Sequence, residues 1–289
     1  MPSSQKTILV TGCSKGGLGA SLAIALAQQG HHVFATARNT AKIPPELVRL
    51  TGVTPLELDV TSTESVAAAA KIVSDATKHQ ENYGLDVLIN NAGRGYTIPI
   101  LDADLEEAKQ VYDTNVWGTI RTTQAFADLV IAKKGRIVNI SSMSAVVNTP
   151  WMGTYASSKA ALTSISDTLR LELSPFGVSV VTIMLGMVAT PFHDNQPQPV
   201  LRPTSRYASI LNTITRWSKG EAGPEGSSVD DVAKTLLPDI LDGGKNGVIW
   251  KGDQSGIVKF ISRWLPTCIL DGLIGQGQGL DELSRTLKK

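Results

Sequence analysis

Short apolar runs and longer amphipathic stretches alternate along the first 190 residues of the chain. The run Thr7–Thr11 is rich in β-branched residues, and glycines follow it before an Ala- and Leu-rich stretch from about Leu18 to Gln29. This order predicts a strand, a turn and a helix. Later apolar runs predict strands at His32–Ala37, Thr54–Leu58, Val87–Asn90, Arg136–Ile140 and Val178–Met184. Because continuous apolar strands between helices are typical of sheets buried on both faces, the sequence predicts an α/β fold with a doubly wound parallel sheet and helices on both faces.

The pattern changes after Thr190. Residues 191–227 are rich in Pro, Gln, Ser and Gly, and they predict a loop with one short helix around Arg206–Trp217. Ser228 is expected to cap a further helix at its N-terminus, because it precedes an apolar periodic stretch and an acidic residue follows three positions later. Gly247–Trp250 predicts a last strand.

We therefore expect one domain over residues 1–250 and a C-terminal helical extension over 251–289. Within the extension, residues 256–274 are unusually apolar for a tail. The apolar positions at helical spacing are Ile257, Phe260, Ile261, Trp264 and Leu265, with Lys259 and Arg263 between them and Pro266 at the end. Three interpretations stay open: a helix packed on the domain or on a second subunit, a lid over an apolar pocket, or a helix at the surface of a membrane or lipid droplet.

Composition narrows the class of protein. The formal net charge is +1 and no basic run stands out, which argues against a nucleic-acid surface. Cys13 and Cys268 are the only cysteines, too few for a disulfide framework or a zinc cluster, so we expect a reducing compartment and no metal. No leader pattern precedes Thr7, and no stretch reaches about 18 uncharged apolar residues, so we expect a cytoplasmic protein without a spanning helix.

The glycine-rich turn TGCSKGGLG at 11–19 lies between the first predicted strand and helix. That context is the one a dinucleotide-binding fingerprint of the Rossmann fold requires. Gly12 permits a tight turn, while Gly17 and Gly19 let the backbone approach a phosphate, which the N-terminus of the helix attracts. The alternative is an ordinary turn between a strand and a helix.

The end of the second strand bears on the choice of dinucleotide. An NAD site normally has Asp or Glu here to hold the ribose 2′-OH. No acidic residue occurs between Gly30 and Pro45, and Arg38 lies just past the strand instead. A guanidinium can hold a 2′-phosphate with two hydrogen bonds, and Lys15 adds a second charge. We expect NADP(H); the alternative is that Arg38 is a solvated surface charge.

Tyr155 and Lys159 lie four residues apart in a predicted helix, so their side chains share a face. A neighbouring ammonium lowers the cost of ionising a phenol, and such a phenol can pass a proton to a carbonyl oxygen as hydride reaches the carbon. Ser142 follows a predicted strand, at the end of the sheet where ligands bind, and its hydroxyl can hold the same oxygen. Strand alternation sends Ser141 and Ser142 in opposite directions, so only one of them faces the site. For Tyr155 and Lys159 alone, the alternative is a packed tyrosine beside a solvated lysine.

Together these segments resemble the short-chain dehydrogenase/reductase family over residues 7 to about 195. The matching features stand in the family's order and approximate spacing. They are the glycine turn, LDV at 58–60, NNAG at 90–93, Asn115 in NVWG, Ser142, and Tyr155 with Lys159. Two features depart from the family pattern: one extra residue, Lys15 or Gly16, separates Gly12 from Gly17, and Leu185-Gly186 replaces the usual Pro-Gly.

The resemblance implies roles for individual residues. Asn115, Ser142, Tyr155 and Lys159 would be the catalytic tetrad, with Asn115 holding a water that links Lys159 to solvent. Asp59 and Val60 would hold the adenine, Asn91, Ala92 and Gly93 would line the cofactor site and brace the sheet, and Val188 and Thr190 would contact the nicotinamide. With Tyr155 and Lys159, the implied cofactor-binding set is Gly12, Ser14, Lys15, Gly17, Leu18, Gly19, Arg38, Asp59, Val60, Asn91, Ala92, Gly93, Val188 and Thr190.

Within the family, the chain is most similar to fungal NADPH-dependent 1-acyldihydroxyacetone-phosphate reductases and related polyketide-tailoring reductases. The basis is the expanded glycine turn, ATAR at 35–38, and the ending VIWKGDQSGIVKFISRWLP. This resemblance implies an NADPH-dependent reductase of a bulky lipid-like or polyketide ketone, in lipid or secondary metabolism. If the surface-helix interpretation of 256–274 holds, we expect peripheral contact with the endoplasmic reticulum or lipid droplets through that segment. The alternatives are a hydroxysteroid or retinol dehydrogenase and a non-catalytic NADP sensor or scaffold. Family members imply a homodimer or homotetramer.

Overall fold

The computed structural model describes residues 5–78 and 83–288, so most of the polar start of the chain lies outside the described residues. Its centre is a sheet of seven strands in the order β3-β2-β1-β4-β5-β6-β9, and every neighbouring pair is parallel. The strands are β1 (Thr7–Val10), β2 (His32–Ala37), β3 (Val53–Glu57), β4 (Val87–Asn90), β5 (Arg136–Ile140), β6 (Ser179–Leu185) and β9 (Gly247–Lys251). The expected parallel sheet of the Rossmann type is confirmed.

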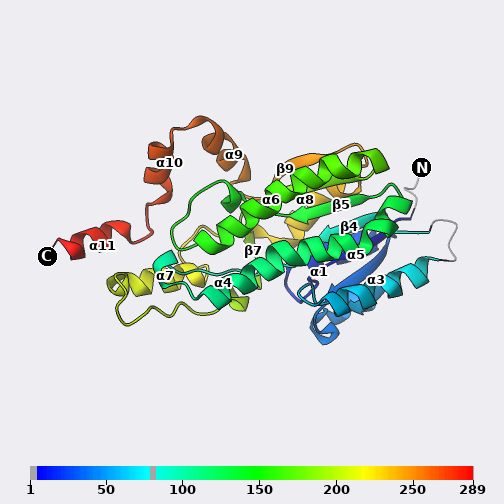
Figure 1. Cartoon of the computed structure of the whole chain (residues 1–289), viewed down its shortest axis with the longest axis horizontal. Helices are drawn as coiled ribbons and strands as arrows, with labels where there is room; N and C mark the ends of the chain where they lie inside the picture. The colour runs from blue at the N-terminus through cyan, green and yellow to red at the C-terminus, as the bar shows by residue number, and fades with distance from the viewer. Residues whose placement is uncertain (1–4, 79–82, 289) are drawn as a thin grey trace.

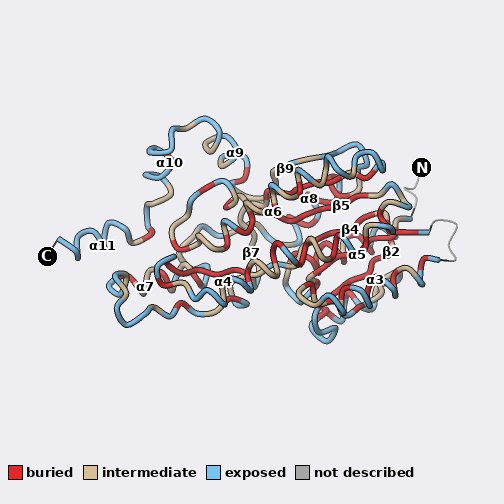
Figure 2. Tube along the Cα trace, viewed as in Figure 1, coloured by how far each residue is buried: buried red, intermediate tan, exposed pale blue. Residues whose placement is uncertain are grey.

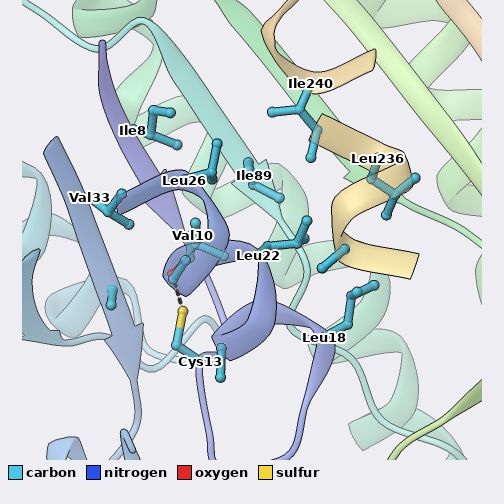
Figure 3. Close-up of a cluster of buried hydrophobic side chains, with 14 of the residues drawn as sticks. Ile8, Val10, Cys13, Leu18, Leu22, Leu26, Val33, Ile89, Leu236 and Ile240 are labelled. Atoms are coloured by element: carbon cyan, nitrogen blue, oxygen red, sulfur yellow. Dashed lines mark hydrogen bonds between the residues drawn. The ribbon is translucent and has the colours of Figure 1, made fainter. Parts of the chain in front are cut away.

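Helices cover both faces of the sheet (Figure 1). On one face lie α1 (Leu18–Gln28) and α8 (Val229–Leu241), and on the other lie α3 (Thr63–Thr77), α5 (Gly118–Ala132) and α6 (Gly153–Leu173). The first face buries apolar side chains of β1, α1 and α8, among them Val10, Leu22 and Leu236, none of which is exposed to solvent (Figure 3). The two packed faces hold the strand ends in fixed positions, as a doubly wound fold requires. The remaining helices of this region are α2 (Pro45–Val48) and α4 (Leu105–Tyr112).

The strand order reverses beside β1, which pairs with β2 on one side and with β4 on the other. In open parallel sheets, ligands bind outside the carboxyl ends of the strands at such a switch point. The turn after β1 and the segment after β4 both reach this place. We therefore expect the functional site to lie in the loops that follow β1, β4 and β5.

The chain between β6 and α8 forms a separate layer beyond these strand ends. The two-residue strand β7 (Val188–Ala189) pairs with β8 (Ser227–Ser228), and the helix expected near 206–217 is a 3₁₀ turn, Ala208–Ile210, that continues into α7 (Leu211–Ser218). Ser228 stands at the N-cap of α8 as expected, but its side chain makes no capping hydrogen bond, so that part of the prediction is wrong. Ser228 is instead part of β8, which pairs with β7.

After β9 the chain forms α9 (Ser255–Trp264), α10 (Thr267–Ile274) and α11 (Leu280–Leu287). These helices extend beyond the end of the sheet (Figure 1), and most of their residues are exposed (Figure 2). Pro266 separates α9 from α10, as its missing N–H predicts. Among the described residues, no helix combines the length and the apolar character needed to cross a bilayer.

Candidate active site

Four side chains singled out from the sequence come together at the carboxyl ends of β4 and β5. Ser142 follows β5, Tyr155 and Lys159 lie in the first turns of α6, and Asn115 lies in a π-helical segment, Asp113–Trp117, before α5. Gly93 lies between them: a Cβ built on it would be 3.6 Å from both Asn115 Oδ1 and Lys159 Nζ. The segment after β4 and the helix α6 are therefore in contact at this point.

The two adjacent serines face different neighbours, as strand alternation predicts. The hydroxyl of Ser141 is buried against α6, where it lies 2.8 Å from Thr163 Oγ1 and donates to the Lys159 carbonyl at 3.2 Å. Ser142 faces the other way and accepts hydrogen bonds from the backbone and hydroxyl of Ser144, at 3.2 and 2.9 Å. Sequence reasoning did not single out Ser144, because nothing in the pattern distinguishes it from other loop serines.

Burial determines the protonation of Tyr155 and Lys159. It raises the pKa of Tyr155 to about 12, against a smaller opposite effect of the Ser142 side chain. Burial also lowers the pKa of Lys159 to about 8. The ammonium donates to the Ile140 carbonyl at 2.8 Å and lies 5.9 Å from the centre of the Tyr155 ring. Near neutral pH the site therefore holds a protonated phenol beside an ammonium group.

The Asn115 side chain is completely buried and fully engaged with protein groups. Its Oδ1 accepts from the Arg94 backbone at 2.8 Å, and its Nδ2 donates to the Arg94 carbonyl at 3.0 Å and to Ser158 Oγ at 2.9 Å. The amide therefore ties the segment after β4 to α6.

The glycine turn after β1 is closely packed against the segment after β4. Gly12 has a φ of +74°, and a Cβ on Gly19 would lie 2.5 Å from Asn91 Nδ2 and from the Gly12 carbonyl. Asn91 Nδ2 donates to the Thr11 carbonyl at 2.9 Å, and the backbone of Ala92 donates to Thr11 Oγ1 at 3.0 Å. These bonds brace β1 against β4, and the turn has no room for larger side chains.

The same turn leaves an anion-binding helix end available. Gly17 is the N-cap of α1, no side chain caps the helix, and its first turn, which starts at the buried Leu18, contains no acidic residue. Free N–H groups and the helix dipole favour a phosphate there. Ser14 and Lys15 are exposed beside this end. The turn therefore fits a dinucleotide pyrophosphate.

The residues expected to surround the adenosine half lie at the ends of β2 and β3. Arg38 is exposed after β2, and neither Arg38 nor Lys15 takes part in an ion pair within residues 5–78 and 83–288. The carboxylate of Asp59 accepts from the backbone and hydroxyl of Thr61, at 2.9 and 2.8 Å. Val60 is buried, and a Cβ on Gly118 would lie 2.9 Å from it.

The segment after β6 packs against the glycine turn and against Tyr155. Val188 lies in β7, and Thr190 Oγ1 accepts from the backbone of Phe192 at 3.4 Å at the start of a 3₁₀ turn. A Cβ on Gly16 would lie 3.0 Å from the Pro191 side chain, and the Phe192 ring lies 5.5 Å from the Tyr155 ring, centre to centre. Sequence reasoning missed Phe192; its position two residues after Thr190 was the available signal.

A buried glutamine holds this segment in place, and no pattern in the sequence predicts its role. Gln196 Oε1 accepts from Thr97 Oγ1 at 3.1 Å, while Nε2 donates to the Ser218 carbonyl and lies 3.1 Å from His193 Nδ1. Burial lowers the pKa of His193, so the ring is neutral near pH 7. Gln196 thus links the segments after β4 and β6 to the end of α7.

Four apolar residues near the motifs differ in their surroundings. Val147 and Trp151 are buried, whereas Met143 and Met187 are partly exposed. Trp151 packs with Ile210 and Ile214 of the α7 region. Trp151 is therefore part of the packed layer beyond the strand ends.

Comparison with known proteins identifies the relationship. A family model described as short chain dehydrogenase matches residues 6–200. The chain is 41% identical over 280 residues to the short-chain dehydrogenase cctT of Talaromyces islandicus, covering 96% of this chain and 97% of the relative. It is 42% identical over 187 residues to an NADPH-dependent 1-acyldihydroxyacetone phosphate reductase of Schizosaccharomyces pombe, covering 65% of this chain and 61% of the relative.

A solved structure supports the same family relationship. A short-chain dehydrogenase from Burkholderia cenocepacia, in complex with NADP, superposes with a TM-score of 0.73 at 26% identity and covers 93% of this chain and 97% of its own. The strand order, the glycine turn and the grouping of Ser142, Tyr155 and Lys159 are thus seen in a chain whose sequence matches one family along most of its length. The chain belongs to the short-chain dehydrogenase family of oxidoreductases.

Proposed function

We propose that the protein is an NADPH-dependent ketone reductase in which Tyr155 donates the proton. The observation that carries the proposal is the buried Tyr155 with Lys159 Nζ 5.9 Å from its ring centre, beside Ser142 at the carboxyl end of β5. In this proposal residues 1–250 form the cofactor-binding and catalytic domain, and residues 251–289 form an extension.

The residues around the glycine turn fit NADP(H). Gly12, Gly17 and Gly19 allow the turn to pack closely on the segment after β4, and the N-terminus of α1, which has no capping side chain, is free to bind the pyrophosphate. The exposed cations Arg38 and Lys15 suit a 2′-phosphate. One relative is named as NADPH-dependent and one structural neighbour contains NADP, which supports this choice. Bound NADPH supplies the hydride; Asp59, Val60, Asn91, Ala92, Gly93, Val188 and Thr190 complete the proposed site.

Side chains of the protein bind the ketone oxygen and donate the proton. Ser142 Oγ donates to the ketone oxygen and holds it against Tyr155. As the carbonyl carbon receives hydride, the Tyr155 O–H bond breaks and its proton goes to the oxygen, giving the alcohol. The Lys159 ammonium stabilises the resulting phenolate, and a water held by Asn115 would return the proton from solvent.

The substrate class that we propose is a bulky lipid-like or polyketide ketone. Phe192 presents an aromatic ring 5.5 Å from the Tyr155 ring, which favours an apolar group beside the carbonyl. The name of the Schizosaccharomyces pombe relative supports an acyl-bearing ketone. Hydroxysteroid or retinol oxidation is the alternative direction; the exposed Arg38, which suits NADP(H), favours reduction.

Turnover of a ketone panel tests the proposal. NADPH absorbance at saturating cofactor should fall with lipid, polyketide or steroid ketones, and Tyr155→Phe should reduce that rate by about 10³-fold or more. The variant should still bind NADPH, measured by fluorescence titration. NADPH binding without turnover of any ketone by the wild-type protein would favour the sensor or scaffold alternative. A Tyr155→Phe variant with the wild-type rate would contradict the assignment of Tyr155.

We also propose that the outer face of α9 contacts a lipid surface on the cytoplasmic side of the endoplasmic reticulum or of lipid droplets. Ile257, Phe260 and Trp264 are 60%, 63% and 70% exposed on this face, with Lys259 and Arg263 beside them. Flotation with anionic liposomes should carry the wild-type chain and not a Phe260→Glu, Trp264→Glu variant. Equal flotation, or none, would contradict the proposal.

We expect a homodimer or homotetramer. Leu105 of α4 and Trp117, which precedes α5, are 72% and 55% exposed, which supports a further contact on this side of the molecule. Sedimentation velocity of the full chain measures the state directly, and a monomer at micromolar concentration would contradict the expectation.

A further inference from the structure

The C-terminal extension returns to the domain through the loop Gly-Gln-Gly-Gln-Gly at 275–279. Gly277 and Gly279 have φ values of +71° and +83°, a conformation that side chains rarely adopt. Two consecutive carbonyls of this loop accept hydrogen bonds from indoles: Gln278 from Trp151 Nε1 at 3.0 Å and Gly277 from Trp217 Nε1 at 3.3 Å. Gln278 itself is only 2% exposed.

Close packing accompanies these two hydrogen bonds. A Cβ on Gly279 would lie 3.2 Å from Thr213 Cγ2, so the loop lies directly on α7. Leu283 of α11 packs against the buried cluster of Trp151, Ile210 and Ile214. The loop and the start of α11 are therefore part of the domain surface, although the preceding helices α9 and α10 are mostly exposed (Figure 2).

Trp151 connects the loop 275–279 to the active site. It has a φ of +70°, which is strained for a residue with a side chain, and its carbonyl accepts from the Ile98 backbone at 2.7 Å. Its ring meets Tyr207 edge to face at 5.4 Å. Trp151 lies two residues before the start of α6 and four before Tyr155. A strained backbone persists only where surrounding contacts hold it, and the C-terminal loop supplies one of them.

The extension also begins next to the active site. Its first helix, α9, follows β9 and contacts the 3₁₀ turn Met143–Ala145, which comes directly after Ser142. The chain thus leaves the domain beside Ser142, passes through α10, and returns beside the approach to Tyr155. Figure 1 shows this arch beyond the carboxyl ends of the strands.

We propose that the loop 275–279 is a positioning element of the substrate site. It holds Trp151, and with it the turn that leads into the Tyr155 helix, in the form that accepts bulky ketones. This inference rests on the proposed function. It predicts that the loop affects the selection of the ketone and leaves NADPH binding unchanged, because the contacts of the loop are with Trp151, Trp217 and Thr213 and not with the glycine turn.

The variant Trp151→Phe keeps an aromatic ring and removes the N–H that bonds to Gln278. It should lower kcat/KM for a bulky ketone about tenfold and change that for a small ketone less than about twofold. The dissociation constant of NADPH should stay unchanged. Phe176→Leu is the control, because that aromatic side chain is 52% exposed in the turn before β6, and it should change the kcat/KM of neither ketone.

A loss that is equal for bulky and small ketones would overturn the inference, because it would report only a smaller folded fraction. Hydrogen exchange gives a second readout that needs no turnover. In full-length chain carrying Trp151→Phe and Trp217→Phe, residues 148–156 should exchange faster, whereas residues 11–19 should not. Unchanged exchange at 148–156 would overturn the positioning role. A wild-type protein that reduces no ketone would instead contradict the proposed function.

Discussion

The cofactor side and the substrate side of the candidate active site are built differently. On the cofactor side, the glycine turn and the segment after β4 continue two paired strands, β1 and β4, and the Thr11 backbone N–H donates to the Ile89 carbonyl at 3.0 Å. On the substrate side, segments distant in the sequence are joined through single side chains: Gln196 accepts from Thr97, and the Trp151 indole donates to the Gln278 carbonyl. Backbone contacts of a sheet tolerate little change, whereas side-chain contacts between loops can be replaced one at a time. This difference leaves a fixed cofactor site next to a substrate site that can vary.

The largest effect should come from the cofactor side, at Lys159. Lys159→Met removes the buried ammonium that stabilises the Tyr155 phenolate, so kcat for ketone reduction should fall about 10²- to 10⁴-fold. The KM for the ketone should change much less, because Ser142 still holds the oxygen. Steady-state kinetics at saturating NADPH measure both values.

Lys134→Met is a control for the loss of one lysine, since Lys134 lies in the turn before β5, at the opposite end of that strand from Ser142. Its kinetics should match those of the wild-type protein. Retention of more than about a tenth of the wild-type kcat by Lys159→Met would contradict the role of the ammonium.

The next largest effect should be at Arg38. Charge-assisted bonds to a 2′-phosphate contribute roughly 1.5–3 kcal/mol, so Arg38→Asp should raise the KM for NADPH about 10- to 100-fold. The KM for NADH should fall or stay constant, because the new carboxylate can accept from the ribose hydroxyls. Arg49→Asp is the matched control, with the same change of charge at another exposed arginine. If both variants raise the KM for NADPH equally, the effect is long-range electrostatics and Arg38 does not contact the phosphate.

The pH dependence of kcat/KM should show a smaller effect of Lys159. Burial lowers the pKa of Lys159 from 10.5 to about 8, so its ammonium is lost as the pH rises through about 8. Above this value kcat/KM for ketone reduction should fall by about tenfold per pH unit, and the profile of Lys159→Met should be flat. Folding stability moves the other way: between about pH 8 and 10.5 the folded chain binds fewer protons than the unfolded chain, so stability rises with pH. A wild-type kcat/KM that stays constant to about pH 10 would falsify the assignment.

The same difference between the two sides explains what could be predicted from the sequence. The strands near Thr7, Val87 and Arg136 and the glycine turn follow from local patterns, since apolar runs and glycines act within a few residues. The contacts of Gln196 and Gln278 do not, because each joins segments that only the folded chain brings together. Phe192 lies in a loop with no periodicity, so only its position two residues after Thr190 pointed to the site, and nothing local predicted its contact with Tyr155. The capping hydrogen bond expected from the Ser228 side chain does not form, because the residue pairs with β7.

The smallest effect should be at Gln196, on the substrate side. Its amide joins Thr97, His193 and the Ser218 carbonyl, and thereby fixes the segment that carries Phe192 against Tyr155. Gln196→Met keeps the volume and removes these hydrogen bonds, each worth about 1 kcal/mol. Because the loop is also held by the pairing of β7 with β8, only part of this loss should reach the substrate.

We therefore expect Gln196→Met to raise the KM for a bulky ketone about three- to tenfold, with the KM for NADPH and kcat within about twofold of wild type. Gln198→Met is the control, since Gln198 is exposed two residues further along the same segment. Equal shifts in the KM for NADPH and for the ketone would mean that Gln196 supports the whole site, and the contrast between a fixed cofactor side and a variable substrate side would then fail. A shift confined to the ketone would locate the variable part of the enzyme in the segment between Thr190 and α7.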